Sequence, residues 1–374
     1  MNHSIKAPKT IQQHRFHLLD GMRGIAAAMV FFIHAPGALA HCFPNGYLAV
    51  DLFFCLSGFV VAFSYEHRLM QKLSAKDFFV LRLIRFYPLY ILGTILLLLR
   101  APFNHEELAF IHSSPGYFVL HLLLAILALP RFAMHSMNAH LYPFNPPAWS
   151  LLAEMIANIG YALAIRKKVK WILLPSVCML AFARLLFSVL HDHTLNVTND
   201  LTALARVCFS FPVGVFLYSI YRKSGNFQRV HSRIAVAIAL LTTILALSFH
   251  NPIRTQWLEL LVITAVFPSL VYFAANVKVP LSLIWFCVLM GDISYPVYML
   301  QGGMRIPDTA SVSRFGEHHL LLLGLLVFAD LLILGIGCWL LNRYYDEPAR
   351  KKITAWYKAR MESSREAKYE TVAG

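Results

Sequence analysis

Charged residues are scarce in this sequence. Asp, Glu, Lys and Arg make up 14% of the 374 residues, whereas hydrophobic residues make up 58%. A soluble globular domain has about a quarter of its residues charged. The composition therefore excludes an ordinary soluble domain. The formal net charge of +14 does not indicate a nucleic-acid-binding surface, because most basic residues stand beside long apolar runs.

Cysteine patterns and nucleotide-binding motifs are also missing. The six cysteines lie mostly within apolar stretches and show no C-x-x-C spacing, which excludes a disulfide framework and a common type of zinc site. Histidines outside the apolar runs are dispersed, so we expect no metal site. Neither a glycine-rich phosphate loop nor a G-x-S-x-G turn occurs, which excludes two frequent classes of enzyme.

Eleven apolar segments follow one another along the chain, and most are long enough to cross about 30 Å of hydrocarbon as a helix. We therefore predict an all-α fold, a polytopic bundle of transmembrane helices. The first segment contains Arg23 and His34 and lacks a clean cleavage site, which predicts a retained span rather than a signal peptide. The predicted segments are 17–40, 48–65, 84–101, 117–130, 149–165, 170–190, 203–221, 234–250, 257–275, 281–301 and 319–342.

The basic residues predict which side each loop faces. One arrangement places 25 Lys and Arg on the cytoplasmic side and four on the other, and it makes both termini cytoplasmic. Termini on one side require an even number of crossings. Segment 117–130 is the weakest, because it has 14 residues, contains His121 and ends at Pro130. We predict about ten crossings, with this segment as a re-entrant or interfacial helix and 102–148 otherwise outside.

No internal repeat and no long soluble insertion interrupts the apolar segments. We therefore predict one membrane-embedded domain, 1–342, followed by a short basic cytoplasmic tail, 343–374. Glu, Lys and Arg alternate in this tail as they do on a solvated helix.

Two ionisable side chains lie inside the first predicted span, Arg23 and His34. Ionisable groups within hydrocarbon are costly and are usually functional or paired. Their separation places both on one face of a helix, about 16 Å apart along its axis. Arg23 is then near the cytoplasmic end and His34 deep toward the outside. For His34, the residues alone leave open a packing role and a catalytic role.

The second predicted span begins with Asp51 and contains the small pair Ser57 and Gly58. A buried carboxylate needs a cation or several hydrogen-bond donors, and either His34 or an arginine could provide one. Close helix packing is the simpler explanation for the small pair. Further charges inside the spans are expected to form structural ion pairs: Arg184, Arg206 and Asp330.

Arg82 and Arg85 stand three residues apart between the second and third predicted spans, on one face of a helix. Guanidinium groups bind phosphate through paired N–H groups, so this pair predicts a cytoplasmic site for a phosphorylated ligand. The alternative is ordinary anchoring by positive charges, which needs no ligand.

Two further motifs combine aromatic and ionisable residues. Trp149 is predicted to lie at the outer membrane interface, where tryptophan is commonly an anchor. Glu154 follows within the same span and must be neutral, paired or facing water. Near the end of the chain, Tyr295 and Tyr298 flank Pro296, which interrupts a predicted helix.

In their order and spacing these segments resemble the acyltransferase 3 family, integral-membrane enzymes best known from bacteria that O-acylate surface and secreted carbohydrates. The resemblance runs nearly end to end. It rests on Leu19-Asp20-Gly21-Met22-Arg23-Gly24 leading to His34; Val50-Asp51-Leu52-Phe53-Phe54 with Leu56-Ser57-Gly58-Phe59; Arg82-x-x-Arg85 before Tyr87-Pro88; Trp149-Ser150-Leu151 with Glu154; Ser294-Tyr295-Pro296-Val297-Tyr298; and Glu347-Pro348.

The resemblance implies that acyl-CoA binds from the cytoplasm and that His34 assists transfer to an acceptor on the far side. His34 would act as general base, oriented by Asp51 or Glu154. The donor-binding residues would be Arg23, Arg82 and Arg85. The residues expected to contact the substrate are Trp149, Ser150, Tyr295 and Tyr298. One departure from the family pattern is Gln301, where many relatives have histidine.

We therefore expect an acyl-CoA-dependent O-acyltransferase that transfers an acyl group, first of all acetyl, to a hydroxyl of an extracytoplasmic or lipid-linked carbohydrate. The expected location is the inner (plasma) membrane of a bacterium. Expected partners are acyl-CoA, the carbohydrate, membrane lipid and proteins of glycan synthesis, with no nucleic acid. The alternative is a transporter or exporter without acyl-transfer chemistry, but no inverted repeat supports it. A scaffold that only binds a partner would leave the buried charges unexplained.

Overall fold

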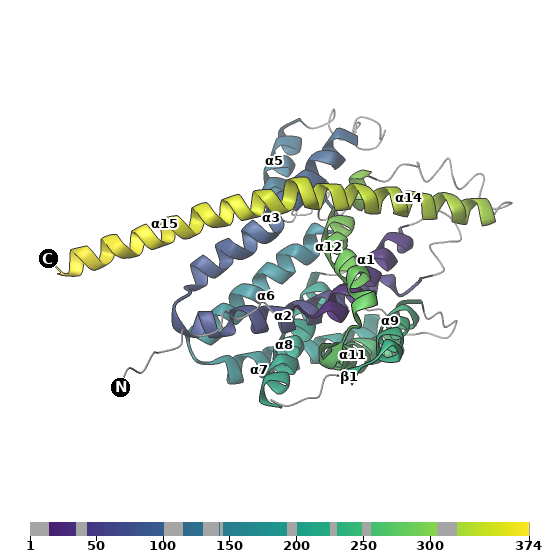
Figure 1. Cartoon of the computed structure of the whole chain (residues 1–374), viewed down its shortest axis with the longest axis horizontal. Coiled ribbons are helices and arrows are strands. Elements are labelled where there is room, and N and C mark those ends of the chain that lie inside the picture. Colours follow the sequence, from purple (N-terminus) through teal and green to yellow (C-terminus); the bar gives the residue numbers. More distant parts are fainter. Residues whose placement is uncertain are drawn as a thin grey trace.

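The structure, a computed structural model, describes residues 15–34, 43–100, 115–129, 142, 145–192, 200–224, 230–248, 256–304 and 320–373. Within these residues each of the eleven predicted apolar segments contains a helix (Figure 1). Eight helices are long and apolar enough to cross a membrane. The prediction of a polytopic helical membrane protein is therefore confirmed, whereas the number of crossings stays a prediction.

The helices follow the order of the predicted segments. Two of them continue through a π-helical turn, η5 (Val262–Val266) or η6 (Asn342–Asp346), into a further helix. A third π-helical turn, η4 (Ser188–Asp192), extends α7, and a short 3-10 turn, η2 (Gly46–Leu48), precedes α2. The helices are α1 (His17–Ile33), α2 (Ala49–Gln71), α3 (Ala75–Arg100), α5 (Pro115–Ile126), α6 (Ala148–Arg166), α7 (Lys170–Phe187), α8 (Asp200–Lys223), α9 (Arg233–Ser248), α10 (Gln256–Leu261), α11 (Phe267–Asn276), α12 (Leu281–Met304), α14 (Leu320–Leu341) and α15 (Glu347–Ala373).

The described residues also contain one small β ladder. Strands β1 (Val230–His231) and β2 (Val277–Lys278) pair in parallel, with Val230 opposite Val277. The ladder joins the segment before α9 to the segment after α11. It is too short to change the all-helical class of the fold.

Helix lengths separate clear candidates for crossing from weaker ones. Helices α1 and α9 have 17 and 16 residues, just below the usual crossing length, whereas α5 has only 12. Helix α5 is held against α3, because the hydroxyls of Tyr87 and Tyr90 donate to the carbonyls of Ile126 and Ala125. Helix α5 is therefore the weakest candidate for a span among the described helices.

Helix α1 occupies the centre of the bundle, where it packs along α12 and also contacts α2, α9 and α11 (Figure 1). A second close contact joins α2 and α8 through two glycines. A Cβ at Gly58 would lie 2.0 Å from the carbonyl oxygen of Phe211, and a Cβ at Gly214 would lie 2.0 Å from that of Cys55. Only glycine allows the two backbones to approach so closely, which confirms the packing explanation for Gly58.

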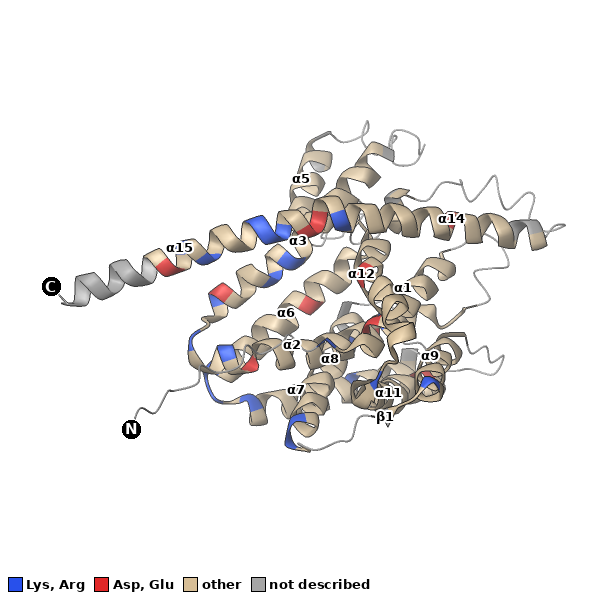
Figure 2. Ribbon diagram, in the orientation of Figure 1, with Lys and Arg blue, Asp and Glu red and all other residues tan. Residues whose placement is uncertain are grey.

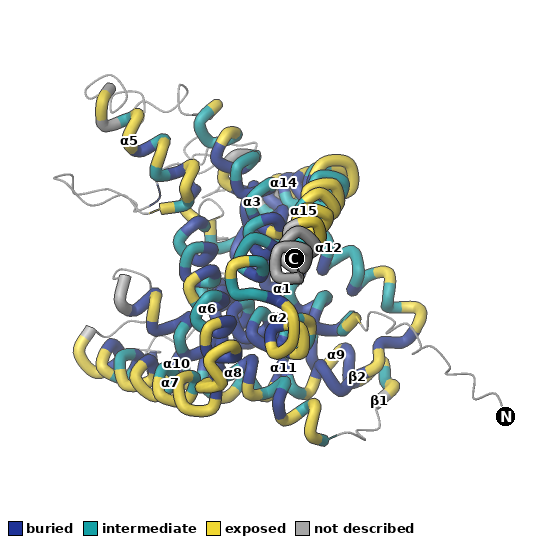
Figure 3. Tube along the Cα trace, turned by 90° about the vertical axis from the view of Figure 1, so that its left-hand side faces the viewer, coloured by how far each residue is buried: buried dark blue, intermediate teal, exposed yellow. Residues whose placement is uncertain are grey.

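Large apolar side chains cover the outside of the bundle, whereas the buried residues gather at its centre (Figure 3). On α7, Met179 and Leu180 are 74% and 73% exposed, and on α14 Leu321 is 80% exposed. A soluble protein rarely exposes so much contiguous apolar surface. These faces are the ones that hydrocarbon would cover.

Two helices differ in extent from the predicted membrane spans. Helix α1 ends at Ile33 rather than near residue 40, and His34 follows it as an exposed residue whose backbone N–H donates to the carbonyl of Phe31. Residues 35–42 lie outside the described residues. Helix α3 begins at Ala75 rather than at 84, so Arg82 and Arg85 lie two turns or more inside it.

Helix α14 passes through η6 into α15, which projects far beyond the bundle (Figure 1). Basic residues are concentrated along α15 and α3 and at the end of α8 (Figure 2). The hydroxyl of Tyr357 on α15 donates to Asp77 at the start of α3 over 2.9 Å, which fixes α15 beside that helix.

Candidate active site

Three groups of polar side chains contain the predicted site residues. The first is the α1–α12 cluster, in which the start of α1 faces the middle of α12. The second is the Glu154 network, between α2, α3 and α6. The third is the Asp51–Arg206 pair, between α2 and α8. The residues of the α1–α12 cluster are Arg15, Asp20, Arg23, Gly291, Asp292 and Ser294.

Asp20 connects the two arginines of the α1–α12 cluster. Its Oδ2 accepts from Nε of Arg15 over 2.6 Å, and its Oδ1 accepts from Nη2 of Arg23 over 3.0 Å. Arg15 also donates to Asp292 on α12 over 2.8 Å. Partial burial would lower the pKa of Arg15, but Asp20 and Asp292 outweigh it and raise that pKa. Arg15 therefore carries a firm positive charge just before α1.

Arg23 reaches from α1 to α12. Its Nε donates to Oγ of Ser294 over 2.9 Å, and its Nη2 donates to the carbonyl of Gly291 over 3.0 Å. Ser294 in turn donates to that same carbonyl over 2.8 Å. The motif Gly-Asp-Ile-Ser therefore fixes the guanidinium of Arg23, which leaves its side chain 31% exposed.

Arg85 lies on α3, which packs against α12. Its side chain is exposed, and within the described part of the chain it forms no ion pair. An exposed guanidinium can bind an anionic group through charge-assisted hydrogen bonds. That Arg23 and Arg85 belong to one anion site stays a prediction.

Arg82 turns away from Arg85 and joins the Glu154 network instead. Its Nη2 donates to Oε1 of Glu154 over 2.7 Å, and Oγ of Ser57 donates to the same oxygen. The guanidinium also lies 4.6 Å from the ring centre of Phe86. Arg82 and Arg85 thus have different surroundings, one buried in an ion pair and the other exposed, and their joint role in donor binding stays a prediction. Positions three residues apart diverge by about 60° around a helix, and one of them is buried.

Asp51 forms an ion pair with Arg206. Nε of Arg206 lies 3.1 and 3.0 Å from the two carboxylate oxygens, Nη2 also donates to Oδ2, and both side chains are fully buried. Arg206 donates further to the carbonyl of Tyr47 over 2.9 Å. Of the two partners considered for Asp51, the structure therefore supplies the arginine. Structural ion pairing, expected for Arg206, is confirmed.

The expected substrate-contacting residues divide into two groups. Oγ of Ser150 and the hydroxyl of Tyr298 lie 2.8 Å apart, which joins α6 to α12. Beside them, the rings of Trp149 and Phe54 stand edge to face at 6.3 Å. Tyr295 instead donates to the carbonyl of Phe86 on α3 over 2.7 Å. One region between α6 and α12 therefore contains Trp149, Ser150 and Tyr298. Tyr295 instead joins α12 to α3.

Gln301 is buried one turn beyond Tyr298. Its Nε2 lies 3.3 Å from the carbonyl of Tyr298, while its Oε1 is buried without a hydrogen-bond partner among the described residues. A buried amide oxygen without a donor is unfavourable. Gln301 therefore offers a buried acceptor beside the tyrosine–proline motif.

Glu66, near the end of α2, is a buried carboxylate that was not predicted to have a role, and it is 3% exposed. Lys170 and Tyr161 donate to its Oε2 over 2.7 and 3.0 Å, and Arg222 donates to its Oε1 over 3.0 Å. Four helices are tied together by this one carboxylate. The sequence did contain an indication of this role, because Glu66 is an acidic residue at the end of a span that basic residues otherwise flank.

Asp20 and Ser294 belong to the motifs on which the family resemblance rests, but neither was predicted to have a role in the site. A sharper prediction was possible for Asp20, because Arg23 follows it by three residues and needs a counter-ion. Within the described ranges, no group of three or more His, Cys, Asp or Glu could hold a metal ion.

Comparisons with known proteins give a consistent result. The family of acyltransferase domains called acyltransferase 3 matches residues 16–346. A Rhizobium radiobacter protein, "Protein 2 in picA locus", is 37% identical over 157 residues, which cover 40% of this chain and 81% of that protein. No solved structure matches this chain.

Proposed function

Since this chain belongs to the acyltransferase 3 family and is thus a multi-pass membrane acyltransferase, we propose that its donor is acyl-CoA and its acceptor a carbohydrate hydroxyl. The donor is cytoplasmic, and the acceptor is extracytoplasmic or lipid-linked. The acyl group that we propose first is acetyl. Family membership decides against a transporter without acyl-transfer chemistry.

The observation that carries this proposal is the guanidinium of Arg23, which Asp20, Gly291 and Ser294 hold in place where α1 meets α12. A second guanidinium, that of Arg85, is exposed on α3, which packs against α12. Coenzyme A carries phosphate groups, which such a pair can bind through charge-assisted hydrogen bonds. Arg15 adds a third positive group, although Asp20 and Asp292 offset part of this charge.

The chemistry needs one base and one leaving group. The acceptor hydroxyl oxygen attacks the thioester carbonyl carbon, a C–O bond forms, and the C–S bond breaks. His34 takes the hydroxyl proton and passes it to the thiolate of coenzyme A. An imidazole suits this role, because its usual pKa lies near neutral pH.

Donor and base are separated along α1. Arg23 and His34 stand eleven residues apart, about 16 Å along the axis, a distance that the extended pantetheine arm must bridge. In this proposal, Glu154 holds the guanidinium of Arg82 in place, and Asp51 holds the guanidinium of Arg206 in place. Both carboxylates are thus positioning residues rather than direct partners of the imidazole. Trp149, Ser150 and Tyr298 contact the acceptor.

The proposed topology has ten crossings. The eight long helices cross together with α1 and α9, and α5 does not cross. Both termini are then in the cytoplasm of a bacterium, and the basic segment 343–374 follows the membrane domain, 1–342, on that side. Single cysteines at Lys168 and Pro146, both exposed, test this topology. We expect a membrane-impermeant maleimide to label Pro146→Cys from outside and Lys168→Cys only after lysis.

The enzymatic proposal is tested with purified protein in nanodiscs. We expect acyl-CoA to bind and its thioester to be lost only when a glycan acceptor is present. Mass spectrometry of surface glycans from the host and a deletion strain then identifies the acylated sugar. Equal acyl content in both strains, with no thioester loss in vitro, would contradict the proposal.

A further inference from the structure

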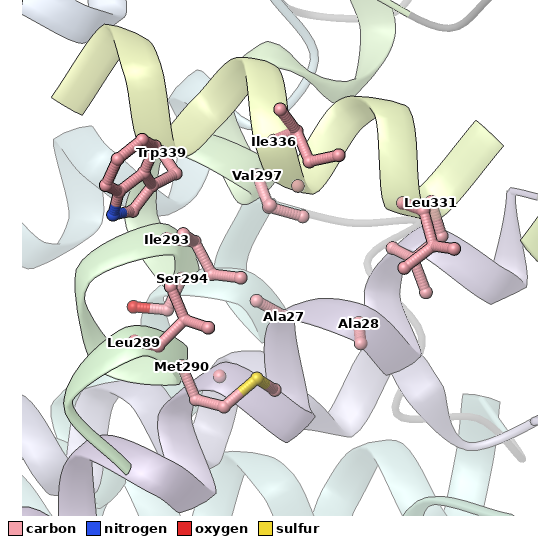
Figure 4. Close-up of a pocket in the computed structure, with 13 residues that line it drawn as sticks. Ala27, Ala28, Leu289, Met290, Ile293, Ser294, Val297, Leu331, Ile336 and Trp339 are labelled. Carbon is pink, nitrogen blue, oxygen red and sulfur yellow. The ribbon is translucent and has the colours of Figure 1, made fainter. Parts of the chain in front are cut away.

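An apolar cavity of about 390 Å³ lies between α1, α12 and α14 (Figure 4). Helix α1 contributes only small residues to its wall, Gly24, Ala27 and Ala28, and α14 contributes Gly335. Longer apolar side chains, such as that of Ile293 on α12, complete the lining. The space therefore exists because small residues on two helices face long apolar side chains.

The lining contains one polar side chain, Ser294, and its hydrogen bonds are made within the protein. Its Oγ accepts from Nε of Arg23 over 2.9 Å and donates to the carbonyl of Gly291 over 2.8 Å. Ser294 therefore needs no polar ligand. Apolar cavities do not hold ordered water, so a hydrocarbon chain is the occupant that this lining favours.

Helix α14 opens the cavity toward the lipid side of the bundle. Leu332, Ile336 and Trp339 line the cavity, and they are also 51%, 61% and 42% exposed. They belong to the apolar surface that hydrocarbon would cover. The cavity is thus continuous with the surface on which bilayer lipids lie, and a chain can enter it sideways without crossing water.

The cavity lies at the depth of one leaflet. Figure 4 shows Leu331 and Trp339 at opposite ends of the wall that α14 provides. Leu331 stands halfway along α14, and Trp339 stands two residues before its end at Leu341. The two positions are about 12 Å apart along the axis, close to the half-thickness of the hydrocarbon, about 15 Å. The cavity therefore runs from the middle of the membrane to the surface at which α14 ends, the cytoplasmic surface in the proposed topology.

Arg343 supplies a positive charge at that surface. It is exposed and stands two residues beyond the end of α14, at the level where lipid phosphates begin. The nearest carboxylates in the chain, those of Asp346 and Glu347, are paired with Arg350 and Lys351 over 2.7 and 2.6 Å. The guanidinium of Arg343 can therefore bind a phosphate.

We propose that this cavity binds one acyl chain of a membrane phospholipid and that Arg343 binds the phosphate of the same molecule. A phospholipid joins a hydrocarbon chain to a phosphate in the order that the cavity and Arg343 require. The acyl chain of the donor is not placed here, because it begins at the thioester beside His34, about 16 Å along α1 from Arg23. The lipid is bound whether or not the protein transfers an acyl group.

The test of the chain site compares two glycines on α14. Neither Gly335 nor Gly324 has any atom within 4 Å of a Cβ added there, so leucine fits at either position. Of the two, only Gly335 lines the cavity. Gly335→Leu therefore fills the cavity, and Gly324→Leu is the matched control with the same added volume on the same helix.

Native mass spectrometry measures phospholipid that stays bound through purification and dioleoyl phosphatidylglycerol added by titration. We expect one retained phospholipid on the wild-type protein and on Gly324→Leu, and at least tenfold lower occupancy on Gly335→Leu. Arg343→Gln should weaken the Kd for dioleoyl phosphatidylglycerol at least threefold. The control is Lys352→Gln, which removes another exposed basic residue beyond α14 and should change that Kd less than twofold.

The inference is overturned if the wild-type protein retains no phospholipid and binds none on titration. Equal occupancy on Gly335→Leu, or an equal loss on Gly324→Leu, would also overturn it. An unchanged Kd in Arg343→Gln would remove the phosphate contact. Displacement of the bound phospholipid by octanoyl-CoA would assign the cavity to the acyl chain of the donor instead. If gel filtration shows that Gly335→Leu does not fold, Ala28→Leu fills the cavity from α1 and takes its place.

Discussion

Arg82 on α3 and Glu154 on α6 form an ion pair with 2.7 Å between Nη2 and Oε1, and both side chains are mostly buried. A guanidinium expected to face the cytoplasm is thus held inside the bundle by a carboxylate from another helix. Glu154→Gln removes the counter-ion and leaves Arg82 charged. We expect a loss of about 3 kcal/mol in stability, seen as a lower melting temperature in detergent.

A double-mutant cycle measures the interaction energy between Arg82 and Glu154 apart from the contacts that each makes with other residues. In Arg82→Met with Glu154→Gln, the buried charge is gone, so the double variant should be more stable than Glu154→Gln alone. Strictly additive losses would show that the two residues do not stabilise each other.

Arg85 should contribute to donor binding far more than Arg82 does. Arg85→Lys keeps the charge but removes the planar group that grips phosphate. We expect coenzyme A affinity to fall more than tenfold, about 1.4 kcal/mol, by calorimetry on the detergent-solubilised protein. Arg82→Lys is the control, with an expected change below threefold. Equal losses of coenzyme A affinity in both variants would show that Arg82 and Arg85 bind the donor together. If neither variant loses affinity, the two arginines serve only to anchor the helix on the cytoplasmic side.

His34 should be needed for transfer and not for assembly. It is exposed at the end of α1, so His34→Ala removes little packing. We expect acyl transfer to be abolished while coenzyme A affinity and melting temperature stay near wild type. Near-normal acylation of the acceptor by this variant would eliminate the general-base role.

The Asp51–Arg206 pair should be the most sensitive ion pair in the bundle, because both side chains are fully buried. Asp51→Asn leaves an unpaired guanidinium inside the protein, and we expect it to destabilise by about 4 kcal/mol. Fluorescence-detected gel filtration after heating measures the loss. Asp51→Leu combined with Arg206→Met should recover much of it. Full stability of Asp51→Asn would mean that Arg206 needs no counter-ion there.

Hydropathy and charge were sufficient to predict the helices but not their exact extents or partners. Helix α3 starts nine residues before the predicted span, because a helix does not stop where hydrocarbon ends, and Arg82 is accommodated by Glu154. Asp51 and Arg206 were both recognised as buried charges. Their pairing joins residues 155 positions apart, and no local pattern specifies which helices become neighbours.

The apolar cavity between α1, α12 and α14 could not be predicted from the sequence for a similar reason. A cavity depends on how three helices diverge, whereas the sequence shows only that Gly24, Ala27 and Ala28 are small. Family resemblance suggested Arg23, Arg82 and Arg85 as donor-binding residues, which stays a prediction. It did not distinguish Arg85 from Arg82, because that difference depends on which side of α3 faces α6.

The close contact between α2 and α8 fixes two charge networks with respect to each other. Gly58 locks α2 against α8, and its neighbour Ser57 contacts Glu154, while Asp51 two turns earlier holds Arg206. Tilting α2 would disturb both networks together. Helix α12 is held against α1 in the same way, because a Cβ at Gly24 would lie 2.5 Å from the carbonyl oxygen of Met290. In mechanical terms, α2 and α8 form one rigid unit that carries both charge networks.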